Sequence, residues 1–161
     1  MTQVAIDVFC KLGTTEGRAR EVAEHLVEAN LKGHDFHGVG MIPNYVSSAV
    51  GGRMAVNADA KIARDKGAVM LVDGQRGFGQ VVGRQATEMG IQRARETGIA
   101  CVGVRDCHHL GRIGTYGELA AAAGLVLDSF RQRRWSRAVR CAWGGREEEN
   151  ANQSFLLRGA D

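Results

Sequence analysis

The sequence has a single proline, Pro43, in 161 residues, although proteins contain about 5% proline on average. It also has no run of about 18 apolar residues, which predicts that no helix crosses a membrane. The first residues, MTQVAIDVFCKLG, lack a basic region followed by an apolar stretch, which argues against a signal peptide. We therefore expect a cytoplasmic protein that does not insert into a membrane.

Paired cysteines are absent as well. Cys10, Cys101, Cys107 and Cys141 show no CxxC spacing, so without a secretory signal we expect reduced thiols. Cys107 precedes two histidines, but a zinc site there would need a second pair of ligands that the sequence does not show. The sequence therefore predicts no metal site.

Charge of one sign is not in large excess. The formal net charge is +3, with 44% hydrophobic and 24% charged residues, which is ordinary for a globular chain. A length of 161 residues suits one domain or the front part of a larger one. Glycine is abundant at 22 residues, which predicts many tight turns.

Residues 1–52 form the first of three predicted parts, an N-terminal helical segment. Thr14 and Thr15 precede an amphipathic helix that ends near Gly33, and residues 44–50 predict a shorter helix. His25 falls among the polar residues of the longer helix, so we expect it on the surface. Positions at 3.6-residue spacing on the opposite face predict the packed side: Ala19, Val22, Ala23, Leu26, Val27 and Asn30.

Residues 53–126 predict a strand-helix-strand-loop-helix unit. Two apolar runs, Ala68–Val72 and Ile99–Val104, are typical of buried strands. A long helix separates them, and a second helix over Tyr116–Ala123 stops at a glycine of the kind that ends helices. The pattern predicts an α/β fold.

Three glycines at positions 77, 79 and 83 have a GxGxxxG spacing that suggests a dinucleotide-binding loop. However, the motif follows an Asp-Gly turn and not a strand, and the acidic residue expected about 20 positions later is missing. We therefore assign no cofactor-binding residue to it, although a helix N-terminus can hold an anion.

Two histidine-rich stretches carry the best chemical indication in the chain. His34, Asp35 and His37 lie within four residues, and His108 and His109 follow the strand that begins at Ile99. Imidazole can donate or accept a proton near pH 7, and an adjacent carboxylate can fix its tautomer. The alternative is a turn in which an aspartate caps a helix and the histidines face solvent.

With both stretches in view, the chain resembles the malate/L-lactate dehydrogenase family, whose members are NAD(P)-dependent 2-hydroxyacid oxidoreductases of a non-Rossmann type. The matching segments are EHLVEANLKGHDFHGVGMIPNYV, the VDG and GFGQ pair, and VRDCHHLGRIGTYGELAAAAGLV, in order over residues 18–126. The resemblance implies part of that family's α/β fold, incomplete at the C-terminus. It also implies NAD or NADP as cofactor, a small 2-hydroxy or 2-oxo acid as substrate, and a homodimer at full length.

The resemblance also implies residue roles. The family's DSHG motif falls on residues 35–38, which makes His37 a candidate acid or base, and a second motif histidine falls on His109. Gly111 and Tyr116 match as well, and we expect them, with Asp35 and His108, to bind substrate or support the histidines. Phe36 stands where the family has serine, which removes a hydroxyl beside His37.

The third part, residues 127–161, departs from the family and is expected to be an aberrant, poorly ordered tail. It carries FRQRRWSRAVRC, whereas the family continues with an apolar strand and a TNPF motif. One-base shifts in the reading frame over residues 131–142 and roughly 149–161 would recover those family strings. We therefore expect a truncated chain with a frameshifted tail, which the gene sequence from Leu125 onward would test.

A second function class stays open at this stage. The arginine cluster could bind nucleic acid or another anionic partner, which would make the chain a small non-catalytic binding domain. The frameshift explains the same arginines without such a partner, so we expect no nucleic acid and favour the dehydrogenase interpretation.

Overall fold

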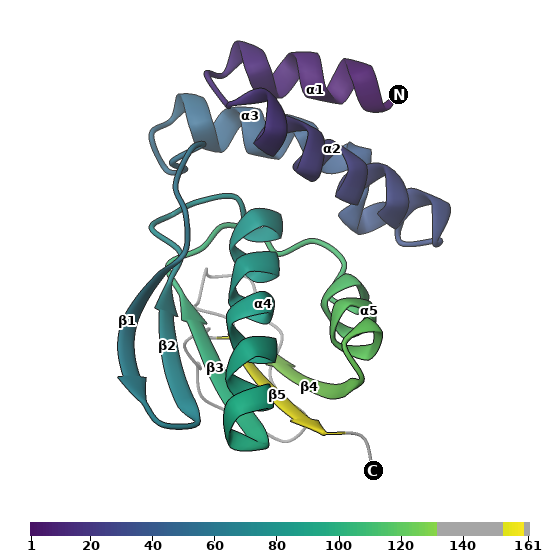
Figure 1. The fold of residues 1–161 in the computed structure, drawn as a ribbon. Helices are drawn as coiled ribbons and strands as arrows, with labels where there is room; N and C mark the ends of the chain where they lie inside the picture. The colour runs from purple at the N-terminus through teal and green to yellow at the C-terminus, as the bar shows by residue number, and fades with distance from the viewer. Residues whose placement is uncertain (132–152, 160–161) are drawn as a thin grey trace, which may run out of the picture.

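The computed structural model describes residues 1–131 and 153–159, and it has an α/β architecture with a separate helical layer (Figure 1). The helical layer contains α1 (Thr2–Lys11), α2 (Glu16–Leu31) and α3 (Ile42–Val50). Two short 3-10 helices, η1 (Asp35–His37) and η2 (Val39–Met41), connect α2 to α3. These elements lie across one end of the α/β part (Figure 1).

The α/β part is a mixed sheet with helices on one face. Its strands are β1 (Lys61–Lys66), β2 (Val69–Asp73), β3 (Ile99–Arg105), β4 (Leu125–Arg131) and β5 (Gln153–Gly159), in the order β1-β2-β3-β5-β4. The β2–β3 pair is parallel, and the other pairs are antiparallel. Because β2 and β3 are parallel, their carboxyl ends meet at the same edge of the sheet, and this edge faces the helical layer (Figure 1).

Helix α4 (Gly79–Thr97) makes the crossover between the parallel strands, and α5 (Gly114–Ala122) connects β3 to β4. Alternate residues of β2 and β3 are buried beneath these helices, among them Val72 and Val102. Helix α4 ends at Gly98, whose φ of 80° is the left-handed conformation that glycine adopts without strain. The apolar strand runs and the helix between them therefore form as the sequence predicts.

A second apolar cluster joins the helical layer to the start of α4. Phe9 of α1, Leu26 of α2 and Tyr45 of α3 are fully buried, and they share this cluster with Phe78, which immediately precedes α4. The two layers therefore have separate cores that meet at the N-terminal end of α4. The sequence interpretation did not predict α1.

The structure differs from the expected poorly ordered tail at two places. Strand β4 extends to Arg131, and β5 pairs with both β3 and β4. Most of the arginine-rich segment lies outside the described residues, as do most of the positions assigned to the frameshift. The fold is α/β as expected, with a strand from the C-terminal part inside the sheet.

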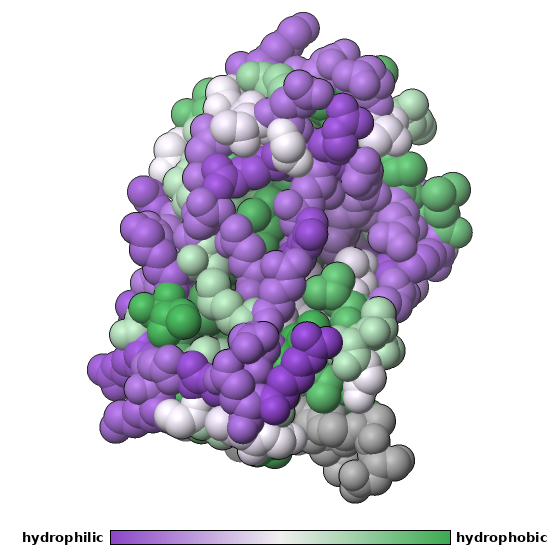
Figure 2. Space-filling view, in the orientation of Figure 1, coloured by the Kyte–Doolittle hydropathy of each residue, from purple (hydrophilic) through white to green (hydrophobic). Residues whose placement is uncertain are grey.

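The helices of the described part of the chain include no candidate for a membrane span. No helix there is both long and apolar enough to cross a bilayer. In the view of Figure 2, hydrophilic side chains predominate over the outer side of α4, with smaller hydrophobic areas beside it. Charged residues on the outer side of α4, such as Arg84 and Glu88, form exposed ion pairs there.

Candidate active site

The candidate site lies where the carboxyl ends of β2 and β3 face the helical layer. The loop after β3, residues 106–113, is tied to the loop after β2 by two backbone hydrogen bonds. Arg76 N–H donates to the Asp106 carbonyl over 2.5 Å, and His108 N–H donates to the Gly77 carbonyl over 2.9 Å. The loop therefore passes beneath the helical layer in a fixed path, and it carries His108 and His109.

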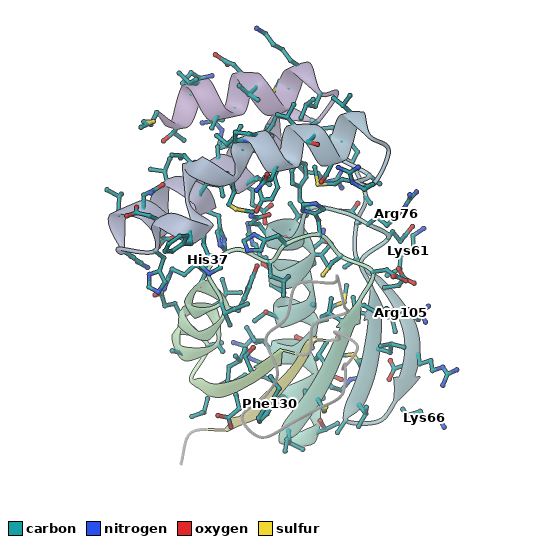
Figure 3. The ribbon with its side chains drawn as sticks, turned by 180° about the vertical axis from the view of Figure 1, so that it is seen from behind. His37, Lys61, Lys66, Arg76, Arg105 and Phe130 are labelled. Carbon is teal, nitrogen blue, oxygen red and sulfur yellow. The ribbon has the colours of Figure 1, made fainter. Side chains whose placement is uncertain are left out.

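The structure brings the two candidate acid-base histidines together from separate layers. His37 lies on η1 and His109 on the loop after β3, and their rings are nearly parallel, at 16°, with centroids 5.0 Å apart. His37 Nδ1 lies 3.0 Å from His109 Nε2, within hydrogen-bond distance. Figure 3 places His37 at the junction of the helical layer and the α/β part. Both residues are partly exposed.

The turn that carries His37 is held by Asn30 near the end of α2. The Asn30 side-chain oxygen accepts the Val39 N–H over 2.8 Å, and its amide donates to Asp35. A methyl group on Gly38 would overlap the Asn30 side chain, so the close packing of this turn requires glycine at 38. Asp35 is exposed and bonds to Asn30, which gives it a role in the turn.

Two residues that the sequence analysis did not select complete the site. The Tyr45 hydroxyl on α3 lies 2.9 Å from His109 Nδ1, and Gln80 Nε2 on α4 donates to the same hydroxyl over 2.7 Å. Tyr45 and Gln80 are buried, and burial raises the pKa of Tyr45 to about 12. Their contacts span 64 and 35 residues along the chain, so no local motif connects them.

The surface position predicted for His25 is wrong. Its side chain is only 8% exposed, because the loop after β3 covers it, and its Nε2 accepts the Arg112 N–H over 3.0 Å. A methyl group on Gly111 would overlap His25 Nε2, so Gly111 serves this close contact. Burial lowers the pKa of His25 to about 4, with a smaller contribution from the positive charge of Arg112. His25 is therefore a neutral acceptor that holds the His109 loop.

The pKa of His25 leads to a testable effect of pH on stability. Between about 4 and its ordinary value of 6.5, the unfolded chain binds a proton at this position and the folded chain does not. The contribution of His25 is therefore complete above pH 6.5 and is lost as pH falls towards 4. We expect His25→Gln, which keeps an acceptor that does not titrate, to weaken this pH dependence.

Urea unfolding of the wild type and His25→Gln at several pH values measures this effect. The difference between their free energies of unfolding should change from pH 4 to 6.5 and stay constant above that range. A difference that is the same at every pH would show that His25 takes up its proton equally in both states.

Other residues singled out in the sequence lie around the loop after β3, residues 106–113. Tyr116 is buried, and its hydroxyl donates to the Leu110 carbonyl over 2.6 Å. The His108 ring lies edge-on to Tyr45 with centroids 5.3 Å apart, and burial lowers its pKa. His34 is exposed and bonds through Nδ1 to the Lys32 carbonyl, so it stands apart from the His37–His109 pair.

The GxGxxxG glycines do not fit a dinucleotide cradle. A methyl group on Gly79 would overlap the carbonyls of His108 and His109, and one on Gly83 would overlap the Tyr116 ring. The space beside these glycines is therefore filled by the protein itself. Within residues 1–131 and 153–159, no group of three or more His, Cys, Asp or Glu side chains could hold a metal ion.

The family relationship follows from comparison with known proteins. The family model described as malate/L-lactate dehydrogenase matches residues 1–154. The chain belongs to the malate/L-lactate dehydrogenase family. Hydroxycarboxylate dehydrogenase B of Escherichia coli O157:H7 is 49% identical over 123 residues, which cover 76% of this chain and 34% of that protein. L-lactate dehydrogenase of Cupriavidus necator is 41% identical over 144 residues, which cover 89% of this chain and 41% of that protein.

Solved structures of this family have the same fold. A putative malate/lactate dehydrogenase from E. coli superposes with a TM-score of 0.79 at 44% identity, over 81% of this chain and 37% of that chain. Sulfolactate dehydrogenase from Methanocaldococcus jannaschii gives a TM-score of 0.81 at 32% identity, over 96% and 44% of the two chains. The resemblance found in the sequence is thus confirmed, and the chain spans about a third of the length of the first of these relatives.

Proposed function

We propose that this chain carries the proton-transfer half of a dehydrogenase site that interconverts a 2-hydroxy acid and its 2-oxoacid. The observation that supports this most strongly is the contact between His37 Nδ1 and His109 Nε2 at 3.0 Å. The two imidazoles come from different layers of the molecule, and both residues are partly exposed. Relatives named hydroxycarboxylate, lactate and sulfolactate dehydrogenase support the same chemistry.

The reaction divides into a hydride and a proton. Reduction of a 2-oxoacid adds a hydride to the carbonyl carbon and a proton to the carbonyl oxygen, and oxidation removes both. A histidine pair that holds one extra proton can give it to the oxygen and is left neutral. In the reverse direction the neutral pair takes the hydroxyl proton.

His37 is the better candidate for direct exchange with the substrate. Both ring nitrogens of His109 are engaged within the protein, Nδ1 by Tyr45 and Nε2 by His37. His37 lies on η1 at the junction of the two layers (Figure 3), and the residue is partly exposed. We therefore assign His37 to exchange the proton and His109 to hold its ring and share the charge.

The cofactor, substrate and assembly belong to the proposal as well. NAD or NADP is the hydride carrier that the family relationship implies. Phe36 beside His37 is 93% exposed, so it fills no internal space and is free to contact the side chain of a bound acid. We further propose a homodimer at full length, located in the cytoplasm, without nucleic acid as a partner.

Two measurements test this function. The first follows NADH or NADPH absorbance with pyruvate, oxaloacetate, malate and lactate. The second titrates the chain with oxamate, an unreactive 2-oxoacid analogue, and follows the imidazole signals of His37 and His109 by NMR. We expect oxamate to shift both signals. The absence of turnover together with unmoved imidazole signals would contradict the proposal, and steeply salt-dependent DNA binding would support the other function class.

A further inference from the structure

A buried chain of hydrogen bonds leads from α4 to the histidine pair. Gln80 Nε2 donates to the Tyr45 hydroxyl over 2.7 Å, and that hydroxyl lies 2.9 Å from His109 Nδ1. His109 Nε2 in turn lies 3.0 Å from His37 Nδ1. The four side chains come from α4, α3, the loop after β3 and η1, so the chain joins both layers of the molecule.

The chemistry of the groups gives this chain a direction. An amide NH2 group can only donate, so the Tyr45 oxygen is the acceptor in its bond with Gln80. The single hydroxyl hydrogen of Tyr45 then points to His109 Nδ1, which must accept it. A neutral His109 with an accepting Nδ1 carries its hydrogen on Nε2, and it donates that hydrogen to His37 Nδ1.

Tyr45 keeps its own proton in this arrangement. Its ring is fully buried against Phe9 and Phe78, which lie with ring centroids 6.3 and 6.0 Å from it. These surroundings disfavour a phenolate and raise the pKa of Tyr45 to about 12. Tyr45 therefore orients His109 and does not carry a proton to it.

We propose that Tyr45 and Gln80 are positioning residues that hold neutral His109 in the tautomer with its hydrogen on Nε2. In this state His37 accepts at Nδ1, so a neutral His37 has its hydrogen on Nε2, where it can donate a hydrogen bond to a carbonyl oxygen. To take a hydroxyl proton at Nε2, the pair must first shift both imidazoles to the other tautomer. The role of this tautomer in the reaction rests on the proposed function. The tautomer itself can be measured in the free protein, without substrate.

Long-range ¹H–¹⁵N NMR of the ¹⁵N-labelled chain tests this directly, because it reports which ring nitrogen carries the hydrogen. The His109 signals are assigned by their loss in His109→Gln. We expect the wild type to show hydrogen on His109 Nε2 and none on Nδ1. In Tyr45→Phe, which removes only the hydroxyl, and in Gln80→Met, which removes the amide that donates to it, both shifts should move towards the average of the two tautomers.

Gln85→Met is the matched control, because Gln85 lies on the same helix and bonds to Ala60 and Asp59 outside this network. It should leave the His109 signals at their wild-type positions. Hydrogen on Nδ1 in the wild type, or wild-type signals in both network variants, would overturn the proposal. If circular dichroism shows that one variant is unfolded, the His109 signals of the wild type and of the other variant still test the proposal. If the wild type shows the expected tautomer but oxamate shifts neither imidazole signal, the positioning role of Tyr45 and Gln80 stands and only the proposed function is contradicted.

Discussion

Replacing His109 by Gln is expected to lower the rate of 2-oxoacid reduction by about 10²- to 10⁴-fold, the usual contribution of a general acid or base. Glutamine can still bond to His37 and Tyr45, but it cannot share the positive charge of the protonated pair, so in the proposed mechanism His37 must hold the transferred proton alone. The His109 ring is partly exposed, so the fold loses little packing. The measurement is the initial rate of NADH or NADPH oxidation with saturating 2-oxoacid.

His34→Gln is the matched control for this loss. His34 immediately precedes η1, the turn that carries His37, but it bonds to the Lys32 carbonyl and lies apart from the pair. Its replacement should leave the rate within about twofold of the wild type, since it removes no proton-transfer group. Equal rates for His109→Gln and the wild type would show that the imidazole contact at 3.0 Å plays no part in the reaction.

The regular elements were predictable because their signals are local. The spacing of apolar residues predicts α2 from its Thr-Thr start to Gly33, and the β-branched run predicts β3. Helix α1 was not predicted, although Ala5, Ile6 and Phe9 form a buried face at helical spacing; it is only 10 residues long. A helix with so short an apolar face depends on the packing beneath it more than on its own pattern.

The environment of the site was not predictable in the same way. His25 looks like a surface residue within its helix, and only the loop 87 residues away turns it into a buried acceptor. Tyr45 and Gln80 likewise read as members of ordinary helices. Their polar atoms meet His109 only when the helical layer closes over the sheet edge. The presence and spacing of the histidines indicate proton-transfer chemistry. Tertiary contacts decide which groups orient the histidine rings.

Gly79→Ala is expected to lower the free energy of unfolding by about 2–3 kcal/mol, the cost of adding a group to a fully packed position. The added methyl group would overlap the carbonyls of His108 and His109, which are backbone atoms and cannot turn aside as a side chain could. The loop that carries His109 must therefore move away from α4, which would also lengthen its contact with His37. Urea unfolding measures the loss, and the imidazole signals of the folded variant report the displacement.

Gly17→Ala separates this effect from the general cost of changing a helical glycine. Gly17 lies in α2 with no atom near the place of an added methyl group, so alanine should stabilise the chain by about 0.5–1 kcal/mol through its helix preference. The two substitutions make the same chemical change, and only the carbonyls above Gly79 give them opposite signs. If Gly79→Ala stabilised the chain as Gly17→Ala does, the loop after β3 could not lie against α4, and the path that brings His109 to His37 would be wrong.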